Sequence, residues 1–300
     1  MEKVELGNSG LKVSEIALGC MSLPDDAAAA ERIIEEALSE GINYFDTADL
    51  YGFGRNEQLV GRTLKKRRGD VFIATKVGNE WDPKTGKKRW NPTKPYILEQ
   101  VKNSLRRLET DYIDLYQLHG GTIEDDIDET IDAFETLKKD GVIRAYGISS
   151  IRPNVIRQYL EKSGLASIMM QYSLLDRRPE EWLDEINEAD VSVVTRGTLA
   201  KGLLTGQALE RATEQQTYLS YSEGALRETL DSLLSVHSSL HALALHAVLS
   251  HPAVTSIAAG ASSAAQLQET LTAYRTPVDK QQIAEAKRLT RQDTYEQHRP

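Results

Sequence analysis

The sequence is short of cysteine: Cys20 is the only one in 300 residues, so no intramolecular disulfide can form. This scarcity is typical of a reducing compartment, and we expect a cytoplasmic protein. The first five residues, MEKVE, are largely charged and lack the apolar core of a secretory signal. No apolar run approaches the roughly 20 residues that a membrane-spanning helix needs. We therefore expect neither a disulfide-stapled fold nor a membrane segment.

Positively charged residues are outnumbered by negatively charged ones. The chain has 36 Lys and Arg residues against 45 Asp and Glu residues, a net charge of −9 at pH 7. This balance argues against nucleic acid or an acidic membrane surface as a partner. The 40% of apolar residues is typical of a soluble globular protein with a sizeable core. Because one α/β barrel takes about 250 residues plus insertions, we expect a single domain over residues 1–300.

Short apolar runs alternate with amphipathic stretches along most of the chain. Each strand–helix–strand unit is too long for a hairpin and suits a parallel crossover. Eight such strands favour a closed (β/α)8 TIM barrel, in the α/β class, over an open doubly wound sheet. The expected strands span 16–19, 44–46, 71–75, 113–118, 143–148, 168–171, 191–195 and 256–259. The expected helices span 24–40, 56–66, 95–107, 127–138, 153–162 and 180–189.

Three segments depart from this alternation. Residues 4–6 and 11–13 flank the turn sequence GNSG, which predicts an N-terminal β-hairpin. Residues 78–95 form a long loop after the third strand, and residues 206–222 form a polar insertion after the seventh. Both would emerge at the face where barrel active sites are built, and loops of this length are usually functional or mobile.

Four polar residues lie at or just after the carboxyl ends of successive expected strands. They are Asp46 and Tyr51 after the second strand, Lys76 after the third and His119 after the fourth. Because the strand ends of a barrel converge on one mouth, we expect these side chains to meet. Alone, each has an ordinary structural explanation, such as a turn aspartate or a packed tyrosine, but the ordered set indicates a site.

The four residue types suit proton transfer. A free tyrosine has a pKa near 10, and we expect a neighbouring lysine ammonium to lower that pKa by stabilising the phenolate. A carboxylate beside the lysine would keep the lysine protonated when it is buried, which is the role expected of Asp46. A histidine next to the phenol can orient a carbonyl group or relay a proton. The cluster therefore predicts a tuned general acid.

The chain resembles the aldo-keto reductase family over nearly its whole length. The resemblance lies in the order and spacing of stretches 46–52, 74–76, 118–119, 147–150, 171–175 and 199–206. It implies NADPH-dependent reduction of a small aldehyde or ketone, with hydride from the nicotinamide and a proton from Tyr51. It also implies a catalytic tetrad of Asp46, Tyr51, Lys76 and His119, and it makes the N-terminal hairpin a plug at the barrel bottom.

The resemblance further implies a cofactor that lies extended across the barrel mouth without a Gly-x-Gly-x-x-Gly turn, and no such turn follows a strand here. By resemblance, Ser149, Ser150 and Gln171 contact the nicotinamide carboxamide, while Gly19 and Cys20 border its ribose. The residues implied for the pyrophosphate are Gly197, Thr198, Leu199, Lys201 and Gly202. Those implied for the adenosine phosphate end are Gly260, Ser262, Gln266 and Thr270.

Four of these positions depart from the usual family pattern. Ser150 replaces an asparagine, which alters one carboxamide contact. Arg196 stands where an aromatic ring commonly stacks on the nicotinamide, and its planar guanidinium can stack in the same way. Ser262 stands where many NADPH-using relatives carry a basic residue, and Thr270 replaces an asparagine that faces the adenine. We therefore expect NADPH to be preferred by a reduced margin, with NADH possible at lower affinity.

Two other functions stay open from the sequence. A barrel lyase could use Lys76 as a Schiff-base amine, and a regulatory or sensor protein could bind the cofactor with weak turnover. Met21 and Trp81 are candidate substrate walls or simple packing residues. No metal site is expected: His237 and His241, spaced i, i+4 on an expected helix, lack an accompanying carboxylate pattern.

Overall fold

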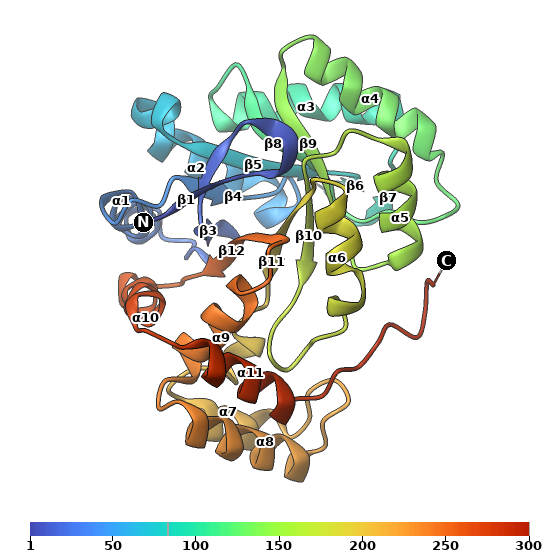
Figure 1. Ribbon diagram of the computed structural model, residues 1–300. Coiled ribbons are helices and arrows are strands. Elements are labelled where there is room, and N and C mark those ends of the chain that lie inside the picture. Colours follow the sequence, from blue (N-terminus) through green and yellow to red (C-terminus); the bar gives the residue numbers. More distant parts are fainter. Residues whose placement is uncertain (83, 300) are drawn as a thin grey trace.

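The computed structural model describes residues 1–82 and 84–299 of the chain. Its centre is a closed barrel of parallel strands in the order β10-β11-β12-β3-β4-β5-β8-β9 (Figure 1). The expected (β/α)8 barrel is confirmed. The barrel strands are β3 (Ile16–Gly19), β4 (Tyr44–Asp46), β5 (Phe72–Val77), β8 (Ile113–Leu118), β9 (Ile143–Ser149), β10 (Ser167–Gln171), β11 (Ser192–Arg196) and β12 (Val254–Gly260).

Helices follow the strands and cover the outside of the barrel. They form where amphipathic stretches follow a capping residue: the Asp26 side chain accepts the Ala29 amide at the start of α1, and Asp126 accepts the Glu129 amide at the start of α4. The apolar faces pack on the barrel in one large cluster. These helices are α1 (Ala27–Ser39), α2 (Arg55–Leu64), α3 (Lys94–Leu108), α4 (Ile127–Lys139), α5 (Pro153–Lys162), α6 (Glu180–Glu188) and α10 (Ala264–Arg275).

A hairpin of β1 (Lys3–Glu5) and β2 (Lys12–Ser14) closes the amino-terminal end of the barrel. Leu6, Leu11 and Val13 are buried in one cluster with residues that fill the barrel interior. Gly7 has a φ of +50°, and a Cβ there would come within 2.2 Å of the Ala166 carbonyl oxygen. The hairpin therefore sits against the strand starts, so the open end of the barrel is the one with the carboxyl ends.

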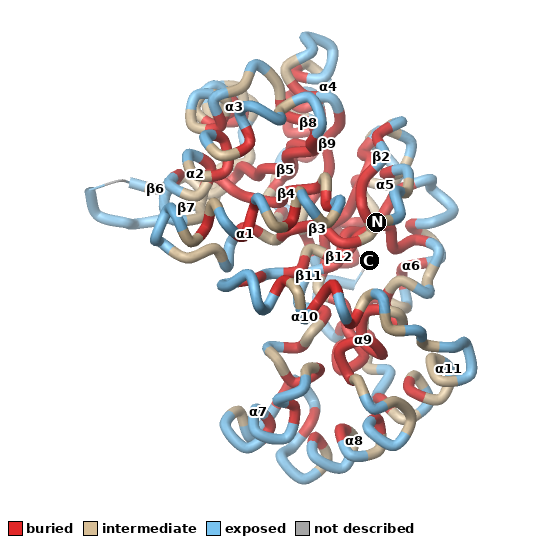
Figure 2. Tube along the Cα trace, turned by 90° about the vertical axis from the view of Figure 1, so that its left-hand side faces the viewer, coloured by how far each residue is buried: buried red, intermediate tan, exposed pale blue. Residues whose placement is uncertain are grey.

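Both long segments contain structure that their composition did not predict. Residues 78–95 include an antiparallel hairpin of β6 (Asn79–Trp81) and β7 (Lys88–Trp90), which projects from the molecule at the left of Figure 2. The expected polar insertion at 206–222 contains helix α7 (Ala208–Gln215) and buries Tyr218 and Tyr221. Neither segment is an unstructured loop.

Helix α7 belongs to a small bundle with α8 (Glu223–Val236), α9 (Leu240–Leu249) and α11 (Lys280–Leu289). These helices share a second apolar cluster, which we call the satellite core, made of Leu174, Leu175, Ala200, Leu203, Leu204, Ala208, Ala212, Tyr218, Tyr221, Leu226, Leu230, Leu233, Leu240, Leu243, Ala244, Ala247 and Ala286. In Figure 1 the bundle lies below the barrel.

The prediction that one helix carries both His237 and His241 is wrong. His237 follows the last residue of α8 in an extended conformation, and His241 lies in α9 after a break where the two axes bend by 86°. In residues 1–82 and 84–299, no single helix has the length and apolar composition to cross a membrane, and only this bent pair meets both criteria together.

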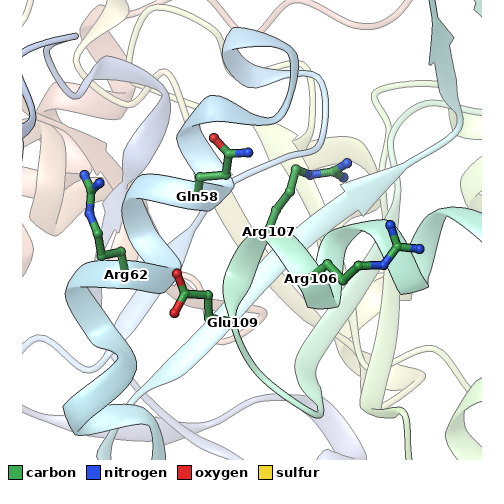
Figure 3. A pocket seen from close by; sticks show the side chains of 5 residues that line it. All are labelled: Gln58, Arg62, Arg106, Arg107 and Glu109. Atoms are coloured by element: carbon green, nitrogen blue, oxygen red, sulfur yellow. The ribbon is translucent and has the colours of Figure 1, made fainter.

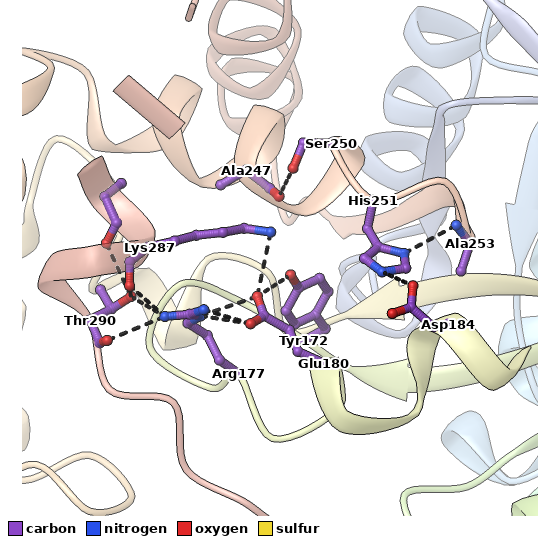
Figure 4. Close-up of polar contacts among 11 residues, drawn as sticks. Tyr172, Arg177, Glu180, Asp184, Ala247, Ser250, His251, Ala253, Lys287 and Thr290 are labelled. Atoms are coloured by element: carbon purple, nitrogen blue, oxygen red, sulfur yellow. Dashed lines mark hydrogen bonds and ion pairs between the residues drawn. The ribbon is translucent and has the colours of Figure 1, made fainter. Parts of the chain in front are cut away.

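A polar network fastens α11 to the segment after β10 (Figure 4). Arg177 contacts Glu180 at 2.6 Å and donates to the Lys287 carbonyl at 2.5 Å, while Tyr172 donates to Glu180 at 2.7 Å. Arg177 and Glu180 are largely buried, so this ion pair is shielded from salt. The network holds the satellite core against the barrel wall.

Candidate active site

The four residues of the expected tetrad meet at the carboxyl end of the barrel. Asp46 is the last residue of β4, Lys76 lies in β5, and His119 follows β8 directly. Tyr51 begins a short turn after β4. The Lys76 ammonium contacts the Asp46 oxygens at 2.7 and 2.9 Å, and it lies 3.4 Å from the Tyr51 hydroxyl oxygen. The strand-end pattern thus brings these side chains together.

Lys76 is fully buried and remains a cation. Burial alone lowers the pKa of Lys76, but the contacts with Asp46 and Tyr51 outweigh burial and leave that pKa above its ordinary value. The ammonium also donates to the Thr47 carbonyl at 2.7 Å, so its protons are directed to three oxygen-bearing groups. Gln117, which the sequence analysis did not select, lies on β8 and donates to Asp46 at 3.5 Å across the intervening strand β5. Gln117 pairs in register with Lys76, and this pairing could have identified Gln117 as a site residue.

The pKa of Tyr51 shifts in the direction opposite to the expectation. Burial raises it above its ordinary value of 10, and the opposing effect of Lys76 does not cancel burial. Exclusion of water from the phenolate was not visible in the sequence, because burial depends on how the turn packs. Without a ligand, Tyr51 is therefore a protonated phenol throughout the neutral range, which suits a proton donor.

His119 is a neutral imidazole. Burial and the positive charges of Lys76 and Arg196 lower its pKa to about 3. Its ring meets the Tyr51 ring edge-on, with 5.9 Å between centroids. Its buried Nδ1 has no hydrogen-bond partner in the described chain. A neutral histidine can direct a hydrogen bond at a carbonyl group, but it cannot act as a cationic acid at neutral pH.

A cavity of about 350 Å³ opens beside His119. The structure lines it with several residues that the sequence reading did not select as substrate contacts, among them Trp90, Thr122 and Arg152. Neither Met21 nor Trp81 lines this cavity: Met21 is 67% exposed, and Trp81 packs edge-on against Phe53 with 5.3 Å between ring centroids. The full lining is Trp90, His119, Gly120, Gly121, Thr122, Ser149, Ser150, Ile151, Arg152 and Arg196.

The residues implied for cofactor contacts lie around the same mouth. Gly19 pairs in register with Gly260 at the ends of β3 and β12, and Cys20 is buried beneath them. The next implied residues sit at strand ends or in a turn with several positive φ angles: Ser149, Ser150, Gln171, Arg196, Gly197, Thr198, Leu199, Lys201 and Gly202. Burial raises the pKa of the Cys20 thiol, which fits a packed side chain and not a nucleophile.

At the start of α10, the implied adenosine contacts already bond to one another. The Ser262 amide and hydroxyl both donate to the Gln266 side-chain oxygen at 2.9 Å. The Ser263 hydroxyl accepts the Gln266 amide and caps the helix. Thr270 is buried and donates to the Gln266 carbonyl at 3.2 Å, so its hydroxyl is also engaged. The side chains of these four residues offer only neutral polar groups.

Asp176, not singled out from the sequence, orients Gln171. The Gln171 amide nitrogen donates to Asp176 at 2.9 Å, and the Gln171 oxygen accepts from Arg196 at 3.2 Å. Arg178 holds Asp176 through two contacts of 2.7 and 2.8 Å. The side-chain amide of Gln171 is therefore held in one orientation at the mouth.

A second hollow, of about 360 Å³, lies on the helical layer between α2 and α3 (Figure 3). It is lined by Gln58, Arg62, Arg106, Arg107 and Glu109, and it contains none of the tetrad residues. Within the described residues, no group of three or more His, Cys, Asp or Glu side chains could hold a metal ion. The tetrad therefore lies outside this hollow.

Comparisons with known proteins agree with this geometry. The family model described as "Aldo/keto reductase family" matches residues 15–291. The chain belongs to the aldo/keto reductase family. This aldo/keto reductase is 52% identical over 305 residues to "Uncharacterized oxidoreductase YqkF" of Bacillus subtilis, with 100% of both chains covered. It superimposes on aldo-keto reductase AKR11C1 from Bacillus halodurans in its holo form with a TM-score of 0.96, at 53% identity and full coverage of both chains.

Family membership makes this aldo/keto reductase a nicotinamide-dependent oxidoreductase that acts on carbonyl compounds. Its more distant relatives differ in the cofactor that their names state. "Aldo-keto reductase yakc [NADP(+)]" of Schizosaccharomyces pombe is 33% identical and aligns with 67% of this chain and 62% of its own. "NADH-specific methylglyoxal reductase" of Escherichia coli is 35% identical and aligns with 69% of this chain and 70% of its own.

Proposed function

We propose that the protein reduces aldehydes or ketones to alcohols with NADPH, and that Tyr51 donates the proton to the carbonyl oxygen. The observation that carries this proposal is the buried Lys76 ammonium, which contacts Asp46 at 2.7 Å and lies 3.4 Å from the Tyr51 hydroxyl. A phenol that must lose a proton needs a nearby cation to stabilise the phenolate, and the Lys76 ammonium is fully buried beside this one.

Each residue of the tetrad has a separate task in this proposal. When bound, the nicotinamide supplies a hydride to the carbonyl carbon. Tyr51 gives its proton to the carbonyl oxygen, and Lys76 stabilises the phenolate that remains. Asp46 keeps Lys76 protonated in a buried position. Neutral His119 directs a ring N–H at the carbonyl oxygen and so orients the substrate.

The mouth has space and donors suited to a nicotinamide cofactor. A Cβ at Gly197 would lie 3.2 Å from Cγ of Gln171, so the glycine leaves room beside the expected carboxamide contact. Gln171 is held in place by Asp176, which supports the role of its amide in binding. We propose NADPH over NADH by a modest margin, because Ser262 and Gln266 offer neutral donors to a 2′-phosphate together with the amino end of α10.

The alternatives have less support. A Schiff-base lyase needs a free amine at Lys76, whereas this side chain is charged and occupied by Asp46, Thr47 and Tyr51. A regulatory cofactor-binding role does not require the complete tetrad, and all four of its members are in place.

We also propose that residues 1–300 act as one domain, because α9 contributes to both the barrel cluster and the satellite core.

The test is the substitution Tyr51→Phe, which removes the proton donor and keeps the ring. We expect turnover of a benzaldehyde to fall by about 10²–10⁴-fold, while NADPH binding, followed by fluorescence titration, stays close to that of the wild type. Steady-state NADPH oxidation and a single-turnover measurement together show whether chemistry limits the rate. Retention of more than a tenth of the wild-type chemical step by the variant would remove Tyr51 from this role.

A further inference from the structure

The cavity beside His119 has an unusual charge balance for an acidic protein. Its lining holds two arginines, Arg152 and Arg196, and no carboxylate. The third ionisable residue of the lining, His119, is neutral because burial lowers its pKa to about 3. In a chain of net charge −9, this cavity is a local site of positive charge.

Arg152 differs from the other shielded arginines of the described chain. Five of these arginines each have a carboxylate oxygen at 2.6 to 3.0 Å: Arg68, Arg107, Arg157, Arg177 and Arg178. Arg152 is likewise only partly exposed, yet no carboxylate of residues 1–82 or 84–299 lies within ion-pair distance of it. A half-buried guanidinium without a counter-ion has lost hydration that no carboxylate replaces.

The position of Arg152 is nevertheless well defined. Its Nη1 donates to the Gly121 carbonyl at 2.6 Å, and its backbone amide donates to the Ser150 hydroxyl at 3.3 Å. Since one guanidinium nitrogen is held by Gly121, the planar group is oriented before any ligand arrives. Such a group presents its other N–H donors in a fork that matches a carboxylate or a phosphate.

The nearest acidic groups are directed elsewhere. Asp125 accepts from the Trp90 indole at 2.8 Å and from the Thr122 amide at 2.7 Å, so both of its oxygens already have donors. Glu124 is exposed, and its pKa is lowered mainly by hydrogen bonds with its own backbone and with Thr122, with Arg152 a lesser cause. Neither carboxylate neutralises Arg152 directly.

Arg196 adds positive charge on the side of the tetrad. It donates to the Gln171 oxygen at 3.2 Å, and its charge lowers the pKa values of Tyr51 and His119 as one contributing cause for each. The remaining wall includes the apolar side chains of Trp90 and Ile151. The cavity therefore combines an apolar surface with two cationic groups next to the reacting centre.

We propose that the carbonyl substrate carries an anionic group, a carboxylate or a phosphate, and that Arg152 binds this group while Tyr51 and His119 face the carbonyl oxygen. This inference rests on the proposed reductase function and names its substrate class. The anion supplies the counter-ion that Arg152 lacks, and the body of the substrate packs on Trp90 and Ile151.

The experiment compares matched charged and neutral aldehydes. The probes are 3- and 4-carboxybenzaldehyde and their methyl esters, measured as kcat/KM with NADPH for the wild type, R152Q, R152K and the control R32Q. Arg32 is an exposed arginine on α1, far along the chain from the cavity. For at least one isomer, the wild type should prefer the acid over its ester by about 10-fold or more, since charge-assisted hydrogen bonds are the strong ones.

In R152Q, kcat/KM for the preferred acid should fall about 10-fold or more, mostly through KM, and by a much larger factor than for the ester. R152K should recover part of the preference, R32Q should keep all of it, and 0.5 M salt should weaken it. Equal wild-type values for acids and esters would overturn the inference, as would an equal loss for both in R152Q. Failure to reduce even benzaldehyde would overturn the proposed reductase function itself.

Discussion

Replacing Asp49 with asparagine is expected to stabilise the protein at pH 8 and to leave its stability at low pH unchanged. Asp49 lies two residues before Tyr51, is 1% exposed, and neither of its carboxyl oxygens makes a well-formed hydrogen bond. Burial, together with the neighbouring Glu57 carboxylate, raises the pKa of Asp49 to about 8. The partial compensation from Arg107 does not offset these effects.

The pH dependence of stability follows from the number of protons that the folded and the unfolded states bind. Between pH 4 and 8 the folded protein keeps the Asp49 proton, while the unfolded chain, with an ordinary pKa of 3.8, has lost it. Because the folded state binds more protons, its stability falls as the pH rises through this window. Each pH unit costs about 1.4 kcal/mol, so the interval from pH 5 to 8 costs about 4 kcal/mol. Above pH 8 the whole cost is present, and below pH 3.8 it vanishes.

The substitution D49N keeps the side-chain size and removes the ionisation. The free energy of unfolding is measured by urea denaturation at pH 5, 6, 7 and 8, and the wild-type value is subtracted from the variant value at each pH. This difference should grow by about 4 kcal/mol from pH 5 to pH 8. The control D25N makes the same chemical change at an exposed position, and its difference should stay level. Parallel curves for D49N and the wild type would refute the reasoning.

Two further predictions concern the site. The rate of the reductive step should stay level from pH 6 to 9. The reason is that His119, with a pKa of about 3, is already neutral, and the raised pKa of Tyr51 keeps the phenol protonated. A change in the single-turnover rate centred near pH 6.5 would show that His119 titrates in this range instead. Ser262→Arg should tighten NADPH by roughly 10-fold or more and leave NADH unchanged, because the new cation meets only the 2′-phosphate; equal tightening in fluorescence titrations would place this segment away from the phosphate.

The tetrad could be predicted from the sequence because it depends on topology alone. Once eight parallel strands are recognised, Asp46, Lys76 and His119 must come to the same end of the barrel, whatever the details of packing. The β6–β7 hairpin was missed because its strands are three residues long and one of them, Lys88–Trp90, is mostly charged. Helix α7 was missed because its eight residues include only a narrow apolar face among polar side chains.

Properties that depend on burial could not be predicted in the same way. The pKa of Tyr51 was expected to fall because Lys76 is visible as a neighbour in the motif, whereas the loss of water around the phenol is not. Arg152 was overlooked for a related reason. Arg152 stands out because no carboxylate lies near it, and this can be seen only once the neighbouring residues are placed in three dimensions.

The satellite core affects which part of the molecule can unfold locally. Most of its apolar contacts are separate from those of the barrel, although α9 takes part in both clusters and Arg177 ties α11 to the segment after β10. We therefore expect α7, α8 and α11 to open as a unit, once that tie is broken, while every barrel strand stays paired. Ala200, Leu203 and Leu204, next to the turn expected to line the pyrophosphate, belong to this unit. Ligand binding to that turn should therefore slow amide hydrogen exchange in helices that the ligand does not contact. The exchange rates of α7, α8 and α11 would then indicate whether a ligand occupies the barrel mouth.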